Sequence, residues 1–269
     1  VNAGNSIASG GNYNTVVGDE AGTALSTGDN NVAIGFQALD AEDAHGNNVA
    51  IGRSALSTLN AGADAFNVAV GHLAGDLMTT GIYNTLMGGA AGDALTDADD
   101  NVAIGTSALG ADTLGSKSTA VGQSALTTQN FTSATDTYNT AVGYYAGVNL
   151  TSGIQNTALG ALALSANTTG VHNIAIGVAA MDASVASSYN IALGTNALGL
   201  TATSGNGFNT AIGHTSMAGA TTAIGNVAIG YRALEANQTG AENVVVGNYA
   251  GIVMTGANNV AVGSSALTA

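Results

Sequence analysis

The chain has 269 residues and a formal net charge of −14 at pH 7; 46% of its residues are hydrophobic, only 7% are charged, and cysteine, proline and tryptophan are absent. This composition excludes a disulfide framework and a cysteine-based metal site, and three basic residues are too few for a nucleic-acid-binding surface. No apolar run approaches the roughly 20 residues of a membrane-spanning helix, and the negative charge disfavours an anionic membrane surface.

Residues 1–13 precede the first complete repeat and are interpreted as a lead-in or partial coil. From residue 14 to residue 269 a five-residue phrase recurs 15 times, as in residues 31–35 (NVAIG) and 139–143 (NTAVG). Ten of the 14 spacings between successive copies are 17 residues. We therefore number 17 columns from the first residue of each phrase, and interpret residues 14–269 as a single repeat domain.

The phrase has the alternation of a β-strand. Column two is always Thr, Val or Ile, column four is always Val, Ile, Leu or Met, and column five is always Gly. A period of two is typical of a strand, and the glycine indicates a corner with an unusual backbone angle. Because 17 residues are too few for a helical pair or a propeller blade, the sequence predicts an all-β parallel β-solenoid of about 15 coils, each with two short strands.

Column four is expected to face the core. Column nine is Leu or Met in ten copies and Gly in five, and in those five coils an apolar residue stands in column twelve instead. We interpret the two columns as alternative sources for one core position, because an empty position would be costly. The column-four residues expected inside are Val17, Ile34, Ile51, Ile104, Val142, Ile176, Ile229 and Val262. The column-twelve residues are Leu25, Met78, Leu95, Leu150 and Met254.

Three insertions follow column nine, around residues 58–66, 127–138 and 199–208. Insertions in a repeat protein map to loops on one side, and surface loops are more mobile than the elements they connect. We therefore expect all three to protrude along the same edge, outside the core.

Column one is Asn in 14 copies, with Ser118 as the exception. Stacked asparagines favour a ladder in which each side-chain amide bonds to the neighbouring coils. This structural role is assigned to Asn31, Asn48, Asn67, Asn84, Asn101, Asn139, Asn156, Asn173 and Asn190.

Columns three and eight are almost entirely Ala. With column four inside, strand alternation places column three outside, where a long strip of methyl groups is unstable in water. We therefore expect a homo-oligomer or an end-to-end filament. The column-three alanines expected at the subunit interface are Ala33, Ala50, Ala103, Ala141, Ala175, Ala192 and Ala228.

The phrase at residues 30–38 (NNVAIGFQA) resembles the head repeats of YadA-like trimeric autotransporter adhesins, and similar repeats occur in phage tail fibres and bacterial surface fibres. The resemblance covers residues 14–269. It implies a left-handed parallel β-roll, a trimeric assembly, and an extracellular, cell-surface or virion location. It also implies a host or surface receptor, without identifying it.

Residues for catalysis or cofactor binding are not evident in the sequence. The four histidines lie in different coils, and no Gly-x-Ser-x-Gly, P-loop or His-Glu-x-x-His motif is present. Two acidic clusters offer the oxygen ligands that Ca²⁺ prefers, although solvated loops are the favoured interpretation. The weak Ca²⁺ candidates are Asp40, Glu42, Asp43, Asp97, Asp99 and Asp100.

Aromatic residues recur just before column one, and Phe131 lies in the longest insertion. Aromatics in irregular loops are candidates for recognition, for example of a glycan. The alternative is that they shield the loop edge and join neighbouring coils. The candidate recognition residues are Phe66, Tyr138, Phe131 and Phe208.

These features predict a structural and adhesive protein, the shaft or head of an oligomeric surface fibre, and no enzyme. The first alternative is an ice-binding β-solenoid, which needs a flat Thr array, but Thr occupies column two in only six of 15 copies. A polysaccharide-degrading tail spike is a further alternative, which needs paired carboxylates in a groove.

Overall fold

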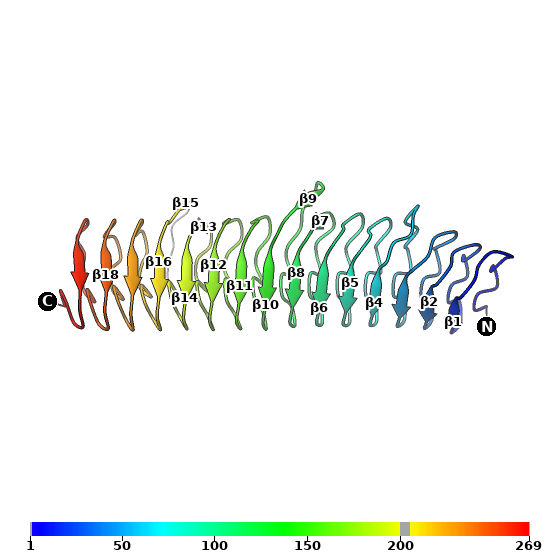
Figure 1. Cartoon of the computed structure of the whole chain (residues 1–269), viewed down its shortest axis with the longest axis horizontal. Coiled ribbons are helices and arrows are strands. Elements are labelled where there is room, and N and C mark those ends of the chain that lie inside the picture. The colour runs from blue at the N-terminus through cyan, green and yellow to red at the C-terminus, as the bar shows by residue number, and fades with distance from the viewer. Residues whose placement is uncertain (1, 200–204, 269) are drawn as a thin grey trace. The chain divides into compact units, whose positions relative to one another are not determined.

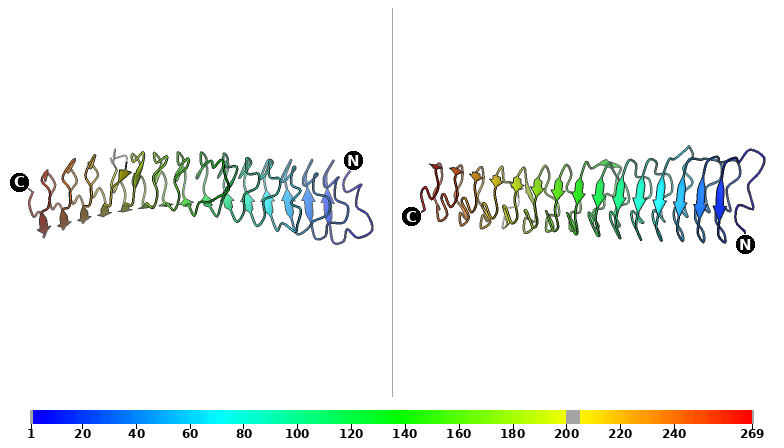
Figure 2. Two further views of the ribbon diagram at one scale, coloured as in Figure 1. Left: turned by 90° about the horizontal axis from the view of Figure 1, so that it is seen from above. Right: turned by 60° about the horizontal axis from the view of Figure 1, so that its bottom comes forward.

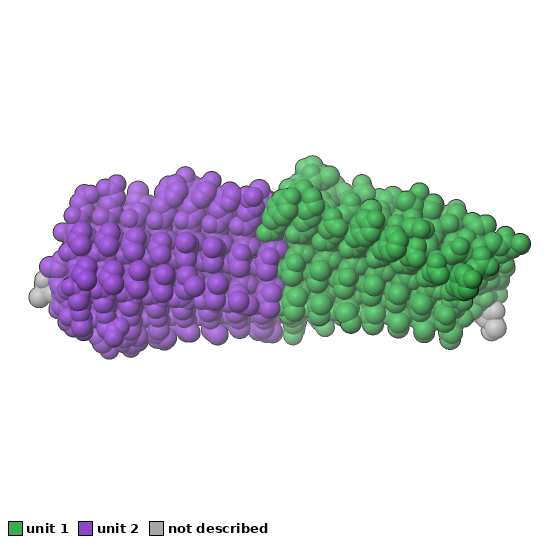
Figure 3. Space-filling view, viewed as in Figure 1, with its two compact units in different colours: residues 1–138 green, residues 139–269 purple. Residues whose placement is uncertain are grey.

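The computed structural model describes residues 2–199 and 205–268. Two compact units are present, residues 1–138 (unit 1) and residues 139–269 (unit 2). Their boundary falls between column seventeen and column one, so that no repeat is divided between the two units. Rows of side chains run in parallel over the surface of each unit, which shows the repeat directly (Figure 3).

Each coil contributes one three-residue strand, formed by columns two to four. In unit 1 these strands are β1 (Thr15–Val17), β2 (Val32–Ile34), β3 (Val49–Ile51), β4 (Val68–Val70), β5 (Thr85–Met87), β6 (Val102–Ile104) and β8 (Thr119–Val121). In unit 2 they are β10 (Thr140–Val142), β11 (Thr157–Leu159), β12 (Ile174–Ile176), β14 (Ile191–Leu193), β16 (Thr210–Ile212), β17 (Val227–Ile229), β18 (Val244–Val246) and β19 (Val260–Val262).

Within each unit, neighbouring strands pair in parallel and in register (Figures 1 and 2). Ala33 pairs with Ala50, for example, and Ala50 with Ala69, although the second pair spans an insertion. Identical columns therefore stack on one another, whatever the length of the loop between them. The described residues contain no helix, and the predicted all-β parallel β-solenoid is confirmed.

The prediction of two strands per coil is wrong. The other strands among the described residues are two-residue segments in two isolated pairs, and each pair includes an insertion. They are β7 (Gly115–Ser116) with β9 (Thr135–Asp136), and β13 (Ser187–Ser188) with β15 (Gly205–Asn206). Turns and bends make up the rest of each coil.

The prediction of which strand face is inside is also wrong. The column-three alanines have exposed fractions of 0–3%, as at Ala33 and Ala261, whereas none of the eight column-four residues expected inside is buried. The side chain of Val17, for example, is 56% exposed. Columns one, three and eight therefore face the interior, and columns two and four face outward. A coil of 17 residues encloses a narrow space, and alanine is small enough to line its strand side while Leu or Met fills the centre.

The invariant glycine of column five is required for two reasons. At Gly35 φ is +132°, a conformation that residues with a side chain rarely adopt. A Cβ atom at this position would also lie 2.5 Å from the carbonyl oxygen of Gly52 in the next coil. The glycine therefore ends the strand and lets successive corners stack closely.

One core position is filled from column nine or from column twelve, as predicted. Leu39 in column nine and Leu25 in column twelve are both fully buried. In a coil with glycine in column nine, a Cβ atom at Gly92 would lie 2.8 Å from the side chains of Leu95 and Leu86. Leu95 thus occupies the space that a column-nine leucine takes elsewhere.

The size of the column-three residue also depends on the residue in column nine. Column three departs from alanine at Val16, Leu86 and Val245, and each of these residues lies in a coil with glycine in column nine. The side chains of Val16 and Val245 would lie 3.3 Å from a Cβ atom at Gly22 and Gly251. A larger column-three residue is therefore accommodated where column nine has no side chain.

The asparagines of column one form a buried ladder. Asn84 Oδ1 accepts a hydrogen bond from the backbone N–H of Asn101 in the next coil, at 3.0 Å. Its Nδ2 donates to the carbonyl oxygen of Ala98, at 2.8 Å, which closes its own coil. Within the seventh coil, Ser118 replaces Asn, and its hydroxyl bonds to Gln129 and Thr137 from the insertion.

The two insertions of unit 1 rise from the same edge of that unit (Figure 1). Their tips are exposed, but Leu59 and Ala65 of one and Gln129 and Phe131 of the other are buried. The expectation that insertions stay outside the core therefore holds for the tips and fails for the anchoring side chains. The third insertion includes residues 200–204, which lie outside the described residues.

Candidate binding surfaces

The first candidate surface is the outward face of the strands, formed in each unit by columns two and four. Over the 15 coils these columns contain no charged residue; 24 of the 30 positions are Val, Ile, Leu or Met. The remaining six are Thr15, Thr85, Thr119, Thr140, Thr157 and Thr210. Several large apolar side chains on this face are substantially exposed, among them Met87, Leu159 and Val244.

The stacking of the coils makes this surface regular. The strands are in register, so that each outward column repeats at the strand spacing of about 4.8 Å. Contiguous apolar surface of this extent is rarely left in water by a monomeric soluble protein and marks an interaction site. We call the outward columns two and four of each unit the strand face.

The second candidate surface is column seventeen, which contains the recurrent aromatics. Its residues adopt the left-handed conformation, with φ of +53° at Phe66 and +59° at Tyr83. The rings of Phe66 and Tyr83 stack with their centroids 5.6 Å apart. Tyr189 stacks on His172 at 4.9 Å and on Phe208 at 5.3 Å. These contacts join adjacent coils, so that a ring within a stack presents its edge to solvent.

The four predicted recognition aromatics differ in accessibility. Phe66, Tyr138 and Phe208 are about half exposed, whereas Phe131 is only 8% exposed and anchors its insertion in the core. Phe131 is therefore not available for surface recognition. Tyr138 is engaged on the surface, because its hydroxyl donates to Asp136 and Lys117 lies over its ring at 5.5 Å.

A second aromatic group lies outside column seventeen. It was not expected from the sequence, because its members lie in columns six and seven. The rings of Tyr231 and Tyr249 meet edge to face at 5.1 Å, and His214 lies 5.5 Å from Tyr231. Arg232 lies over the ring of Tyr249 and forms an ion pair with Glu235. Residues 17 apart share a column, and this spacing is the signal that relates His214 to Tyr231.

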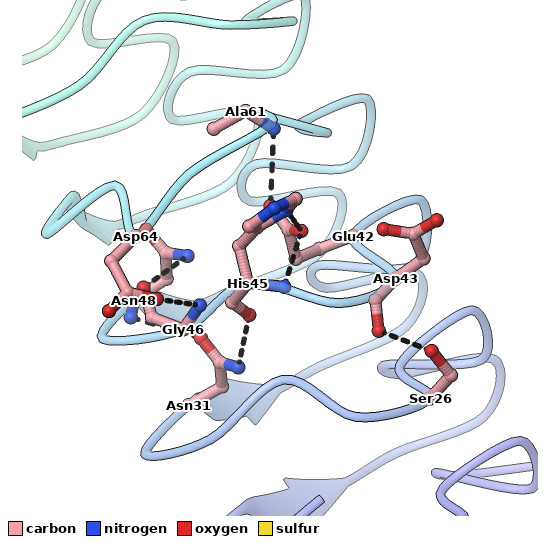
Figure 4. Close-up of polar contacts among 9 residues, drawn as sticks. All are labelled: Ser26, Asn31, Glu42, Asp43, His45, Gly46, Asn48, Ala61 and Asp64. Carbon is pink, nitrogen blue, oxygen red and sulfur yellow. Dashed lines mark hydrogen bonds and ion pairs between the residues drawn. The ribbon is translucent and has the colours of Figure 1, made fainter.

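One of the proposed Ca²⁺ clusters is assembled in part. Glu42, Asp43 and His45 place oxygen or nitrogen atoms within 4.8 Å of one another, but Asp40 is not in this group. The fully buried carboxylate of Glu42 already accepts hydrogen bonds from the backbone N–H of His45, at 3.2 Å, and of Ala61, at 3.4 Å (Figure 4). These bonds hold the loop of this coil, which is a structural role.

The carboxylates of the other cluster also bond to the preceding coil. Asp97 accepts a hydrogen bond from the hydroxyl of Thr80, at 2.6 Å, and Asp99 from the backbone N–H of Ile82, at 2.8 Å. Partial burial raises the pKa of Asp99, and the charges of Asp97 and Asp100 act in the same direction. No three of these acids converge on one point among the described residues.

Column ten contains partly buried acids whose pKa values are perturbed. Burial raises the pKa of Asp40, and the charges of Glu20 and Asp76 add to this effect. Burial likewise raises the pKa of Asp93, which also faces the charge of Asp76. In unit 2 burial raises the pKa of Asp182.

No family model, no curated protein and no solved structure matches this chain. Its function is therefore inferred from its own surfaces. Within the described part of the chain, none of the segments is a helix long and apolar enough to cross a membrane.

Proposed function

We propose that this protein is a structural and adhesive component of an extracellular fibre, whose chains associate through the strand face. The observation that carries the proposal is the strand face itself, which is uncharged in all 30 positions and has no buried position in the single chain. Burial of apolar surface is the main favourable contribution to association. Copies of the same chain are the simplest occupant, because most soluble oligomers are built from identical subunits.

The resemblance to trimeric adhesin repeats favours three chains around one axis, at the surface of a cell or of a virus particle. In this arrangement the alanines line the interior of each chain, and the larger residues of columns two and four meet between chains. The proposed interface therefore consists of columns two and four, which flank column three, one of the columns expected there from the sequence. The aromatic columns remain on the flanks, where a receptor can reach them.

Sedimentation equilibrium tests the assembly. The wild-type chain is expected to give a mass near three times 25.9 kDa. A triple variant of the strand face, Ile34→Glu, Ile51→Glu and Ile104→Glu, is expected to be monomeric and folded, because buried charges without partners oppose association. The matched control places the same three charges on exposed insertion tips, as Asn60→Glu, Thr132→Glu and Ser133→Glu, and is expected to keep the oligomer. A wild-type chain that stays monomeric at high concentration would contradict the proposal.

Ice binding is the second candidate, and the regular strand face favours it. A flat, uncharged array of methyl-bearing side chains at a constant spacing suits an ordered surface such as ice, and six of its positions are Thr. The two functions make opposite demands on the strand face, which is covered in an oligomer and open in an ice-binding monomer. A monomeric wild-type chain that shapes ice crystals, with shaping lost in the Ile→Glu triple variant, would replace the fibre proposal.

A further inference from the structure

Column seventeen of unit 2 contains a gap next to an aromatic stack. His172, Tyr189 and Phe208 stack in consecutive coils, and the next residue of the column is Gly225. One face of the Phe208 ring is covered by Tyr189. The other face points toward Gly225, which has no side chain to cover it, and Phe208 is 57% exposed.

Gly225 places no side chain between Phe208 and Glu242. A Cβ atom placed on Gly225 would have atoms of Glu242 as its three nearest neighbours, at 3.5–3.9 Å, and none of Phe208 among them. Glu242 is the column-seventeen residue of the following coil and is exposed. Phe208 and Glu242 are therefore two coils apart, roughly 10 Å at the usual strand spacing. This distance leaves room for about one ring, and we call the space between the ring of Phe208 and the side chain of Glu242 the slot.

We propose that this slot binds one hexopyranose residue of a neutral glycan. The axial C–H groups of a pyranose ring carry partial positive charge and pack against the negative face of an aromatic ring. The Glu242 carboxylate accepts hydrogen bonds from hydroxyl groups at the ring edge. The negative charge of Glu242 at the slot disfavours acidic sugars.

Other rings of column seventeen are less suited to this role than Phe208, because their faces are already occupied. Tyr189 has rings on both sides, and Tyr138 has Lys117 over its ring. The proposal rests on the proposed attachment function and gives it a ligand class. A single stacked sugar binds weakly, and several chains in one fibre raise the overall affinity through multivalency.

The test uses saturation-transfer NMR and calorimetry on the full chain, with cellotetraose and chitotetraose as probes. The wild type is expected to transfer saturation to the C–H protons of a pyranose ring. Gly225→Tyr fills the slot with the residue that Tyr83 and Tyr189 supply in other coils, at the same positive φ of about 60°. This variant is expected to fold and to bind the probe with an affinity at least about tenfold lower than that of the wild type.

The matched control is Asn30→Tyr, which places a tyrosine at another exposed column-seventeen position with positive φ, in unit 1 and away from the slot, and is expected to bind like the wild type. Phe208→Ala is expected to abolish binding. The proposal is overturned if neither probe binds the wild type, if Gly225→Tyr binds as tightly as the wild type, or if a sulfated tetrasaccharide binds better. Sedimentation of the same samples separates the two proposals: a wild type that is oligomeric but binds neither probe rejects the slot alone, and a wild type that is monomeric but binds a probe rejects the fibre alone.

Discussion

An asparagine in column one fits its buried position because its side chain carries an acceptor and a donor on one short stem. In Asn84 the oxygen accepts the N–H of the next ladder residue, while the NH₂ group bonds within its own coil and to Asn67 of the coil before. A leucine of similar size would leave these buried backbone groups without partners, and each such group costs about 1–3 kcal/mol.

Replacing Asn84 by alanine is therefore expected to lower the free energy of unfolding of unit 1 by about 3 kcal/mol. Chemical denaturation followed by circular dichroism measures this change. Asn60→Ala removes the same side chain from an exposed position of the same unit and is expected to change the stability by less than about 0.5 kcal/mol. Equal effects of the two substitutions would show that the ladder contributes nothing beyond a surface asparagine.

The exchange between columns nine and twelve gives a second prediction. Gly92→Leu alone forces extra volume against Leu86 and Leu95 and is expected to destabilise unit 1 by about 1–3 kcal/mol. The triple variant Gly92→Leu, Leu86→Ala and Leu95→Ser converts this coil to the commoner pattern and is expected to recover most of that loss. Thermal unfolding compares the two variants, and a triple variant less stable than the single one would reject the shared core position.

At the scale of the strand, burial follows side-chain size rather than apolar character. Ala103 of β6 is fully buried, and its neighbour Ile104 is 37% exposed. Ala103→Glu is therefore expected to prevent unit 1 from folding, because an isolated charge in so narrow an interior has no partner. Ile104→Glu adds the same charge on the opposite face and is expected to keep the circular dichroism spectrum of the wild type. The reverse result would restore the orientation first expected from the sequence.

The strands and their register were predictable from the sequence, and their orientation was not. The 17-residue spacing of the phrase fixes which residues stack. The sequence also marks one core position, because one coil has Leu39 in column nine, whereas another has Gly22 in column nine and Leu25 in column twelve. Alternation alone, however, defines two faces without saying which is inside. Hydrophobicity alone favours Ile34 over Ala33 as the inward residue, which is the wrong face. In a coil this narrow, the volume of Ile34 does not fit beside a column-nine leucine.

Two further signals were present in the sequence. Val16, Leu86 and Val245 occur only in coils with glycine in column nine, which places column three against column nine in the interior. The open face of Phe208 depends on Gly225, a residue 17 positions away, and is evident only once column seventeen is seen as a stack of rings. The burial of Phe131 could not be foreseen, because an insertion has no counterpart in the other coils.

The charges of the whole molecule are distributed unevenly. Residues 1–138 contain 14 acids and two basic residues, whereas residues 139–269 contain three acids and one basic residue. Within unit 1 the pKa values of Asp40, Asp93 and Asp99 are raised by partial burial and by neighbouring carboxylates. The ionised form of these groups is thus less favourable in the folded state than in the unfolded chain.

A raised folded-state pKa means that the folded state binds protons more tightly than the unfolded chain does. Stability from these three groups is present below the ordinary pKa of 3.8 and is lost as the pH rises through the higher folded-state values. The free energy of unfolding of unit 1 is therefore expected to increase from pH 7 to about pH 4.5. The lowered pKa of exposed Asp136, which is hydrogen-bonded to Lys117, acts in the opposite direction below this range.

Thermal unfolding at several pH values measures this dependence. The variant Asp40→Asn with Asp93→Asn removes two of the three groups and is expected to be more stable than the wild type at pH 7 and less dependent on pH. Asp64→Asn, at an exposed insertion tip, is the control for the loss of a negative charge. A wild type that loses stability steadily from pH 7 downward would contradict the assignment.

The ladder allows a unit to be lengthened or shortened by whole coils. Asn156 accepts the N–H of Asn173 and donates its own N–H to Asn139, in the same geometry as its neighbours. Excision of residues 156–172 would bring Asn173 onto Asn139 with every ladder bond replaced by an equivalent one, and would shorten unit 2 by about 4.8 Å. Removal of residues from columns one to nine, which include the strand, would instead put unlike columns on top of one another. Duplication or loss of DNA between near-identical repeats can therefore change the length of the solenoid while each surviving coil keeps its fold.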